Sequence, residues 1–202
     1  MADNNTKPYE IITGPFEVWV GAVDTTDPEI QATPSSPWVQ LGTSGSKNIS
    51  DDGVMVSHPQ ALEFIRMVGS TGPRKAVRTE EDFLLSFTLQ DMTLAYYSYI
   101  MNGNTVNSTA ADSDTGGFSY MSMHRGLIVS QLALIIRGAS PEGADWTNQY
   151  QVPVAVMTST PEVVATKGEA QGLLFEFQAL EDPDDDDYPF GKLLTQTADA
   201  TG

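Results

Sequence analysis

The chain has 202 residues, of which 40% are hydrophobic, and its 27 acidic and 10 basic residues give a formal net charge of −17. This size and hydrophobicity suffice for one folded domain, expected to span residues 1–202. The negative charge argues against non-specific binding to nucleic acid or an anionic membrane, and the lack of cysteine excludes disulfides, thiolate metal sites and cysteine nucleophiles.

The polar N-terminus predicts a flexible arm over residues 1–8, with no apolar core of the kind that a secretory signal has. The longest apolar run, Leu127–Ile136, is too short to cross a bilayer. We therefore expect a protein that is made in a cytoplasm and has no membrane contact.

The first half of the chain reads as strands separated by polar loops. Phe16–Val23 alternates apolar and other residues and predicts a strand, and Asp24–Pro37 predicts a long loop that could bridge to other copies. Further strand-like runs follow, with a kink or bulge expected at His58-Pro59: Trp38–Leu41, Val54–Ser57 and Leu62–Val68. The Gly/Pro turn after Val68 predicts a long hairpin.

Next comes a strand over Phe83–Leu89, in which every second residue is large and apolar. These core candidates are Phe83, Leu85, Phe87 and Leu89. A helix is expected at about 91–101, with an N-cap at Gln90 or Asp91 and a stop at Asn102-Gly103. Its predicted apolar face holds Met92, Ala95, Tyr96, Tyr99 and Ile100.

The second half predicts a flexible loop, four more strands and an acidic tail. The loop spans Asn102–Gly117, and because Asn102 belongs to the helix stop, residues 103–117 are the loop itself. The tail spans Glu181–Gly202. The strands are expected at Phe118–His124, Leu127–Arg137, Gln149–Met157 and Leu173–Leu180. The strand at 127–137 is apolar on both faces, so it should be central in the core or buried by another subunit. The sequence therefore predicts an all-β protein with one short helix, an antiparallel β-sandwich or barrel from which a long hairpin projects.

No catalytic constellation is visible, so we do not expect an enzyme or a cofactor. His58 and His124 lack ligand or base spacing, and Glu80 and Asp82 share a strand face but favour a solvated edge. The run Asp184–Asp187 is the best calcium candidate, although consecutive residues cannot all converge on one ion. A mobile acidic segment is the favoured interpretation of that run.

The long hairpin is a positive island in an acidic chain. Between Val54 and Thr79, four basic residues and one acid, Glu63, give a net charge of +3, which leaves −20 for the rest. The candidate subunit-interface residues are Arg66, Arg74, Lys75, Arg78 and the single aromatic residue Phe64. Because base-stacking aromatic residues are otherwise missing there, self-assembly is a better explanation than nucleic-acid binding.

The segment from about Trp38 to Met101 resembles the tail tube (major tail) proteins of long-tailed, non-contractile bacteriophages. The resemblance lies in Trp38-Val39-Gln40-Leu41-Gly42-Thr43-Ser44 before the hairpin, and in the run from Thr79-Glu80-Glu81-Asp82 through Ser86-Phe87-Thr88-Leu89 to Thr93-Leu94. It implies a structural virion protein of the tail that stacks as hexameric rings into a hollow tube. It also implies partners: further copies of this chain, the tape measure protein, the tail terminator and the distal tail protein, with genomic DNA passing through without specific binding.

The sequence leaves other functions open. Another ring-forming tail part, such as a tail terminator or the tube of a contractile machine, would fit the same fold. A calcium-dependent carbohydrate-binding or adhesion β-sandwich is a further alternative, based on Trp19, Trp38, Trp146 and the aspartate run.

Overall fold

The computed structural model describes residues 16–42, 45–160, 162–163, 167–168 and 170–199. Its strands are antiparallel and it contains one short α-helix, so the predicted all-β class is confirmed. The predicted arm at 1–8, the Thr43-Ser44 step and the last three residues of the acidic tail lie outside the described residues.

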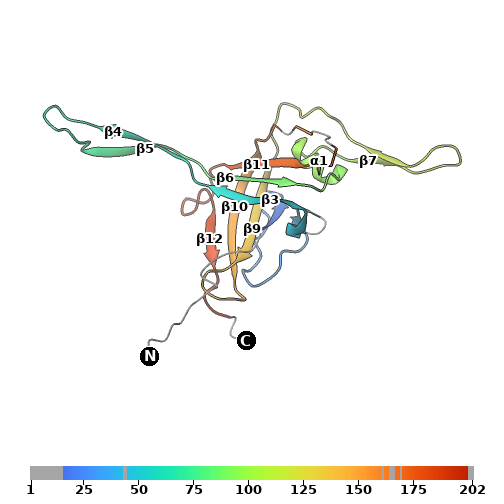
Figure 1. Ribbon diagram of the computed structural model, residues 1–202, viewed down its shortest axis with the longest axis horizontal. Helices are drawn as coiled ribbons and strands as arrows, with labels where there is room; N and C mark the ends of the chain where they lie inside the picture. The colour runs from blue at the N-terminus through green and yellow to red at the C-terminus, as the bar shows by residue number, and fades with distance from the viewer. Residues whose placement is uncertain (1–15, 43–44, 161, 164–166, 169, 200–202) are drawn as a thin grey trace.

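An eight-stranded sheet forms the body of the molecule (Figure 1). Its order is β2-β1-β9-β10-β11-β6-β3, and β12 pairs with β10 beside this path. The strands are β1 (Glu17–Gly21), β2 (Val39–Gln40), β3 (Ile49–Ser57), β6 (Leu84–Leu89), β9 (Gln131–Ala139), β10 (Thr147–Met157), β11 (Leu173–Ala179) and β12 (Lys192–Thr195). A short 3-10 helix, η2 (Gly45–Asn48), precedes β3.

Strand β10 makes the sheet fold on itself. Its first half, Asn148–Gln151, pairs with β12, and its last residues, Ala155–Met157, pair with β11. The two halves are separated by a register shift between Val152 and Ala155, where Pro153 cannot donate a ladder hydrogen bond. Strands β1 and β9 therefore face β6 and β11 across one apolar core.

The alternation predicted for β6 is what builds this core. Phe83, Leu85, Phe87 and Leu89 are buried, and the rings of Phe87 and Phe175 stack with centroids 5.2 Å apart. Other buried core side chains come from the remaining strands: Val18, Val20, Leu134, Ile136, Val152, Leu173, Phe175 and Phe177. Period-two burial over β6 and β11 shows that each strand has one apolar and one more polar face.

The long loop at 24–37 covers the opposite face of β1 and β9. Trp19, Trp38, Ala133 and Ile135 form a second buried cluster there. The guanidinium of Arg137 donates to the backbone carbonyls of Ile30 and Ala32, and the Trp38 indole donates to the carbonyl of Thr26 at 3.0 Å. Burial lowers the pKa of Arg137, and the nearby Glu17 carboxylate opposes that shift. The loop is thus anchored to its own sheet.

The helix α1 (Leu94–Ile100) is shorter than the expected 91–101, and the predicted N-cap is wrong. Thr93 is the cap, because its hydroxyl accepts a hydrogen bond from the backbone N–H of Tyr96 at 3.3 Å. Asp91 instead accepts one from the Asn48 side chain at 2.6 Å. The stop agrees with the sequence: the N–H of Gly103, which has a φ of 73°, bonds to the carbonyl of Ser98.

One face of α1 packs on the core. Ile100 is fully buried, while Tyr96 and Tyr99 are half-buried against the same cluster. Burial raises the pKa of Tyr99, with a smaller contribution from Tyr96; the pKa of Tyr96 is raised by burial and by the Asp91 carboxylate.

The largest differences from the sequence-based expectation in the second half lie between residues 103 and 131. Strand β9 begins at Gln131 rather than Leu127, because Leu127–Val129 is exposed in the segment that leads into it. The predicted strand Phe118–His124 ends at Tyr120, and the predicted loop at 103–117 contains a strand, β7 (Asn107–Thr109), that pairs with β8 (Phe118–Tyr120).

The acidic tail also contains more structure than its composition indicated. Strand β12 lies within it and pairs with β10. It begins after a turn that ends at Gly191, whose φ is 100° and whose missing Cβ would lie 2.0 Å from the backbone oxygen of Gln151. Only glycine fits this crossing, so Gly191 fixes where the tail joins the sheet.

Candidate assembly surfaces

The long hairpin, residues 60–81, projects from the body as a separate two-stranded ribbon (Figure 1). Strand β4 (Gln60–Ile65) pairs with β5 (Lys75–Glu81), with a bulge between Ala61 and Leu62. A hinge joins the ribbon to β3 and β6: the predicted kink at His58-Pro59 interrupts the strand there, and the N–H of Asp82 bonds to the carbonyl of Pro59 at 3.0 Å.

The hairpin's predicted interface cations have two different environments. The Arg66 side chain donates to the carbonyl of Thr71 at 3.2 Å, and Arg78 forms an ion pair with Glu81 at 2.8 Å and donates to Gln60. Arg74 and Lys75 have exposed side chains without a bonding partner among the described residues. These two are the cations that remain available to another molecule.

Apolar side chains are also exposed along this ribbon. Phe64 is 53% exposed, and its neighbours are similarly open: Leu62, Ile65, Met67, Val68 and Val77. Every residue of β5 is exposed. A lone two-stranded ribbon with both edges and both faces in water is marginally stable, and exposed apolar patches typically mark contact sites. The hairpin is therefore a surface that lacks a covering partner.

A second arm, residues 103–130, was not predicted as a projection. Figure 1 shows its β7–β8 hairpin leaving the body on the side opposite the long hairpin. The side-chain amide of Asn102 donates to the carbonyls of Arg125 and Ile128, both at 2.7 Å, and that of Asn104 donates to Ser122 and His124. Exposed apolar residues line this arm: Phe118, Tyr120, Met123, Leu127, Ile128 and Val129.

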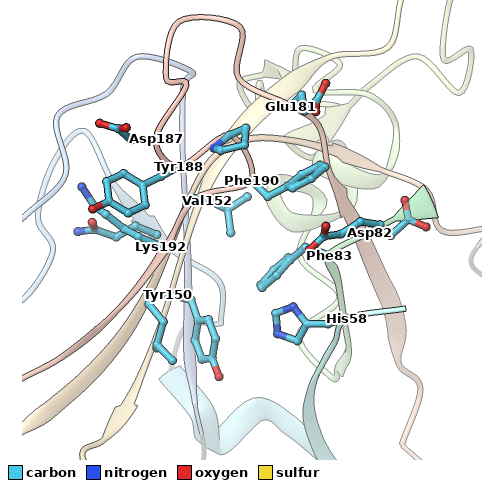
Figure 2. Close-up of a pocket in the computed structure, with 15 residues that line it drawn as sticks. His58, Asp82, Phe83, Tyr150, Val152, Glu181, Asp187, Tyr188, Phe190 and Lys192 are labelled. Atoms are coloured by element: carbon cyan, nitrogen blue, oxygen red, sulfur yellow. The ribbon is translucent and has the colours of Figure 1, made fainter. Parts of the chain in front are cut away.

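A cavity of about 510 Å³ lies at the hinge (Figure 2). Its aromatic lining is Phe83, Tyr150, Tyr188 and Phe190, and its carboxylates are Glu81, Asp82, Glu181 and Asp187. His58 also lines it, with its ring 5.0 Å from that of Phe83 in an edge-to-face contact. Lys192 is the basic residue of this hinge cavity, and its ammonium lies 6.0 Å from the centre of the Tyr188 ring.

The carboxylates of the hinge cavity are only partly engaged. Glu81 pairs with Arg78, and Asp82 accepts a hydrogen bond from Gln178 at 2.8 Å. Glu181 and Asp187 are exposed, and their carboxylates bond to no side chain in the described part of the chain. The cavity therefore has an apolar floor and a rim with uncompensated negative charge.

The polar face is the outer surface of β3, β6 and β11. Ser86 lies between Met55 on β3 and Glu176 on β11, and Leu84 lies between Ser57 and Gln178. Glu176 is the one charged side chain in these two rows. Strand β3 also ends the sheet, so its far edge carries unpaired backbone groups among the described strands.

The structure weakens the chemical alternatives raised by the sequence. Trp19 and Trp38 are buried and the Trp146 indole donates to Asp199, so two of the three tryptophans are unavailable to stack on a sugar. Within the aspartate run, the carboxylate of Asp185 accepts backbone N–H bonds from Asp187 and Tyr188. The described residues contain no group of three or more side chains suited to holding a metal ion.

Some candidate residues lie apart and others were missed by sequence reasoning. His124 lies in the second arm, where its ring nitrogen accepts from the N–H of Gly126, far along the chain from His58 at the hinge. Sequence reasoning missed three residues that line the hinge cavity, because it placed them only in an acidic tail: Glu181, Tyr188 and Phe190. The Tyr188-Pro189-Phe190 step after the aspartate run was the available signal, because aromatic residues are unusual in a solvated acidic segment.

No family model and no curated protein matches this sequence. Among solved structures, the chain is similar to a chain in the cryo-EM structure of the anti-feeding prophage (AFP) baseplate, 6-fold symmetrised, with a TM-score of 0.41 and 8% sequence identity. That similarity covers 92% of this chain and 91% of the other.

In the described part of this chain, no helix has the length and apolar character needed to span a membrane.

Proposed function

We propose that this chain is a structural, non-catalytic protein of a phage tail, whose copies form hexameric rings that stack into the hollow tube through which DNA is delivered. Its partners are then further copies of itself, with a tape measure protein inside the tube and terminator and distal tail proteins at its ends. The sequence resemblance from Trp38 to Met101 supports this proposal, as do the surfaces that the single chain leaves uncovered.

The long hairpin is the observation that carries the proposal. Its strands expose apolar and cationic side chains, and neither face of the ribbon packs on the body. Contacts with identical copies would bury these side chains and pair the free strand edges. The charges of hairpin and body would steer such contacts, since residues 60–81 carry four basic and three acidic side chains, a net charge of +1, against −18 for the rest of the chain.

The polar face is our candidate for the wall of the bore. Strands β3, β6, β11 and the end of β10 give four adjacent strands per copy. Six copies then supply about 24 strands at ~4.8 Å spacing, and a strand tilt of up to ~45° gives a wall roughly 37–50 Å across. Duplex DNA, ~20 Å wide, fits inside a wall of that size.

The chemistry of the polar face suits a passage for DNA. In the rows that pair across β3, β6 and β11 the side chains are mainly hydroxyls, amides and apolar groups, with Glu176 as the charged member. The exposed carboxylates of Asp51 and Asp52 lie at the register shift of β3. Such a wall offers no cation to hold a phosphate backbone, so DNA would slide rather than bind. The basic residues of the hairpin lie away from this face on a separate ribbon, which fits our expectation that they serve subunit contacts.

Electron microscopy of the purified protein tests the proposal directly. We expect concentrated wild-type protein to form hollow tubes with six-fold symmetry in negative stain. Single rings that do not stack would indicate a terminator-like role. A protein that stays monomeric at high concentration, without forming rings or stacks, would refute the proposal.

Charge reversal on the hairpin gives a second test. Arg74→Glu should prevent tube formation while the circular dichroism and melting temperature of the monomer stay unchanged, because the Arg74 side chain is exposed and has no bonding partner within the described chain. We expect Arg78→Glu to act in the same direction, although it also removes the contact to Glu81. Unimpaired tubes from both variants would contradict a role for these cations in assembly.

A further inference from the structure

We infer that the hinge cavity is the receptor for the long hairpin of a neighbouring copy: the hairpin's apolar side chains enter the aromatic floor, and Arg74 and Lys75 meet the rim carboxylates. This inference rests on the proposed function, because it names the two surfaces that join copies within or between rings. It goes further by assigning a binding site to residues near the C-terminal end of the chain.

The floor of the cavity matches the apolar part of the hairpin. Phe83, Tyr150, Tyr188 and Phe190 line a space of about 510 Å³, which lies within the ~300–1,000 Å³ typical of sites that bury a ligand. Phe64 is 53% exposed and has no aromatic contact of its own in the described structure. An aromatic anchor that enters an aromatic pocket is the kind of contact that dominates binding energy in protein interfaces.

The carboxylates at the rim of the cavity are complementary in charge to the cations of the hairpin. Four carboxylates and one ammonium give the cavity a formal charge of −3 with neutral His58, from Glu81, Asp82, Glu181, Asp187 and Lys192. Glu181 and Asp187 have no side-chain partner in the described chain, and neither have Arg74 and Lys75 on the hairpin. Two unpaired anions on one surface and two unpaired cations on the other are electrostatically complementary.

A hairpin cannot fill the cavity of its own chain. Glu81 and Asp82 line the cavity and also form the root of the ribbon. Figure 1 shows that the ribbon extends from this root away from the body. The seven residues of β5 alone span ~23 Å. The contact is therefore head-to-tail between copies, and repetition of such a contact closes a ring or continues a helix.

Two non-assembling variants that restore each other would identify this contact. The hairpin-reversed variant carries Arg74→Glu and Lys75→Glu, and the cavity-reversed variant carries Glu181→Lys and Asp187→Lys. We expect each alone to form no tubes at up to about ten times the concentration at which wild-type protein assembles, measured by sedimentation velocity and negative-stain microscopy. In an equimolar mixture each hairpin can meet a cavity of opposite charge on the other variant, so tubes should return to within about threefold of the wild-type concentration.

The aspartate run supplies a matched control. Asp184 and Asp186 do not line the hinge cavity, so Asp184→Lys with Asp186→Lys makes the same change in charge outside it. This control should assemble alone and should not restore the hairpin-reversed variant. Melting curves of all variants establish that each is folded before mixing.

The possible results separate the inference from the proposed function. Wild-type tubes together with a cavity-reversed variant that assembles normally would overturn the inference and leave the tube function standing. Rescue of the hairpin-reversed variant by the control as well would also overturn it, since net charge alone would then explain assembly. If wild-type protein forms no ring or tube, both proposals are wrong.

Discussion

Arg137 shows how one side chain can position a long segment. The sequence places it at the end of the expected strand Leu127–Arg137 and assigns it no role. In the fold it is 8% exposed, and its guanidinium binds two carbonyls of the loop at 24–37. A buried cation of this kind is tolerated because several oxygens replace its hydration shell. The order of the loop thus depends on a residue about a hundred positions later in the chain.

The variant Arg137→Met should lower the free energy of unfolding by about 1–3 kcal/mol, because it keeps the aliphatic volume but leaves the carbonyls of Ile30 and Ala32 without donors. Chemical denaturation of the monomer would measure this loss. Arg74→Met is the matched control, and it should not change stability measurably because its side chain is exposed. Equal effects of the two changes would show that the guanidinium does not hold the loop.

Among the elements, α1 and β6 show the clearest link between local pattern and packing. The period-two pattern of β6 places Leu85, Phe87 and Leu89 in the core, and the following chain reverses through Thr93 into the helix. The helix is only seven residues long, too short to be stable alone, so its order depends on packing of Tyr99 and Ile100 against that core.

This packing predicts a loss of stability at high pH. Because burial raises the pKa of Tyr99 above its unfolded value of ~10, the folded state favours the neutral phenol. The contribution to stability is complete below pH ~10 and is lost as pH rises through the folded pKa. Thermal melts between neutral and strongly alkaline pH should therefore show a steeper fall for wild type than for Tyr99→Phe. The exposed Tyr120→Phe should behave like wild type, and identical curves for all three proteins would contradict the explanation.

At the scale of the whole molecule, the body separates its surfaces by chemistry. The strands of the polar face, β3, β6 and β11, carry no basic side chain, the loop at 24–37 covers the opposite side of the body, and two arms extend in opposite directions (Figure 1). In a monomer the apolar side chains of the two arms are exposed to water, whereas a closed assembly can bury both arms between copies.

Single-cysteine labelling can locate the polar face in the assembled tube, because the natural chain contains no cysteine. Biotinylated Ser86→Cys should bind a bulky avidin probe as a monomer but be protected in long tubes, except at their ends. Thr33→Cys, exposed on the loop across the body, should stay accessible in both states. Accessible Ser86→Cys along the tube wall would place the polar face outside and remove it from the bore.

Local patterns in the sequence determined the all-β class, the alternating strand at Phe83–Leu89, the kink at His58-Pro59 and the long basic hairpin. These features follow from side-chain periodicity and from backbone restrictions that operate within a few residues. The same local reasoning failed at Leu127–Val129, whose apolar composition fits a strand although the segment is exposed. Burial depends on what packs against a segment, and periodicity carries no information about that.

Only the tertiary structure brought the hinge, β10 and residues 181–193 together around one cavity. These segments are distant in the chain, and their meeting depends on β12 pairing with β10 and on the close crossing at Gly191. Composition alone assigned the same residues to a solvated acidic tail. Long-range strand pairing decided otherwise, because it placed the carboxylates and aromatic rings of that tail at the root of the hairpin.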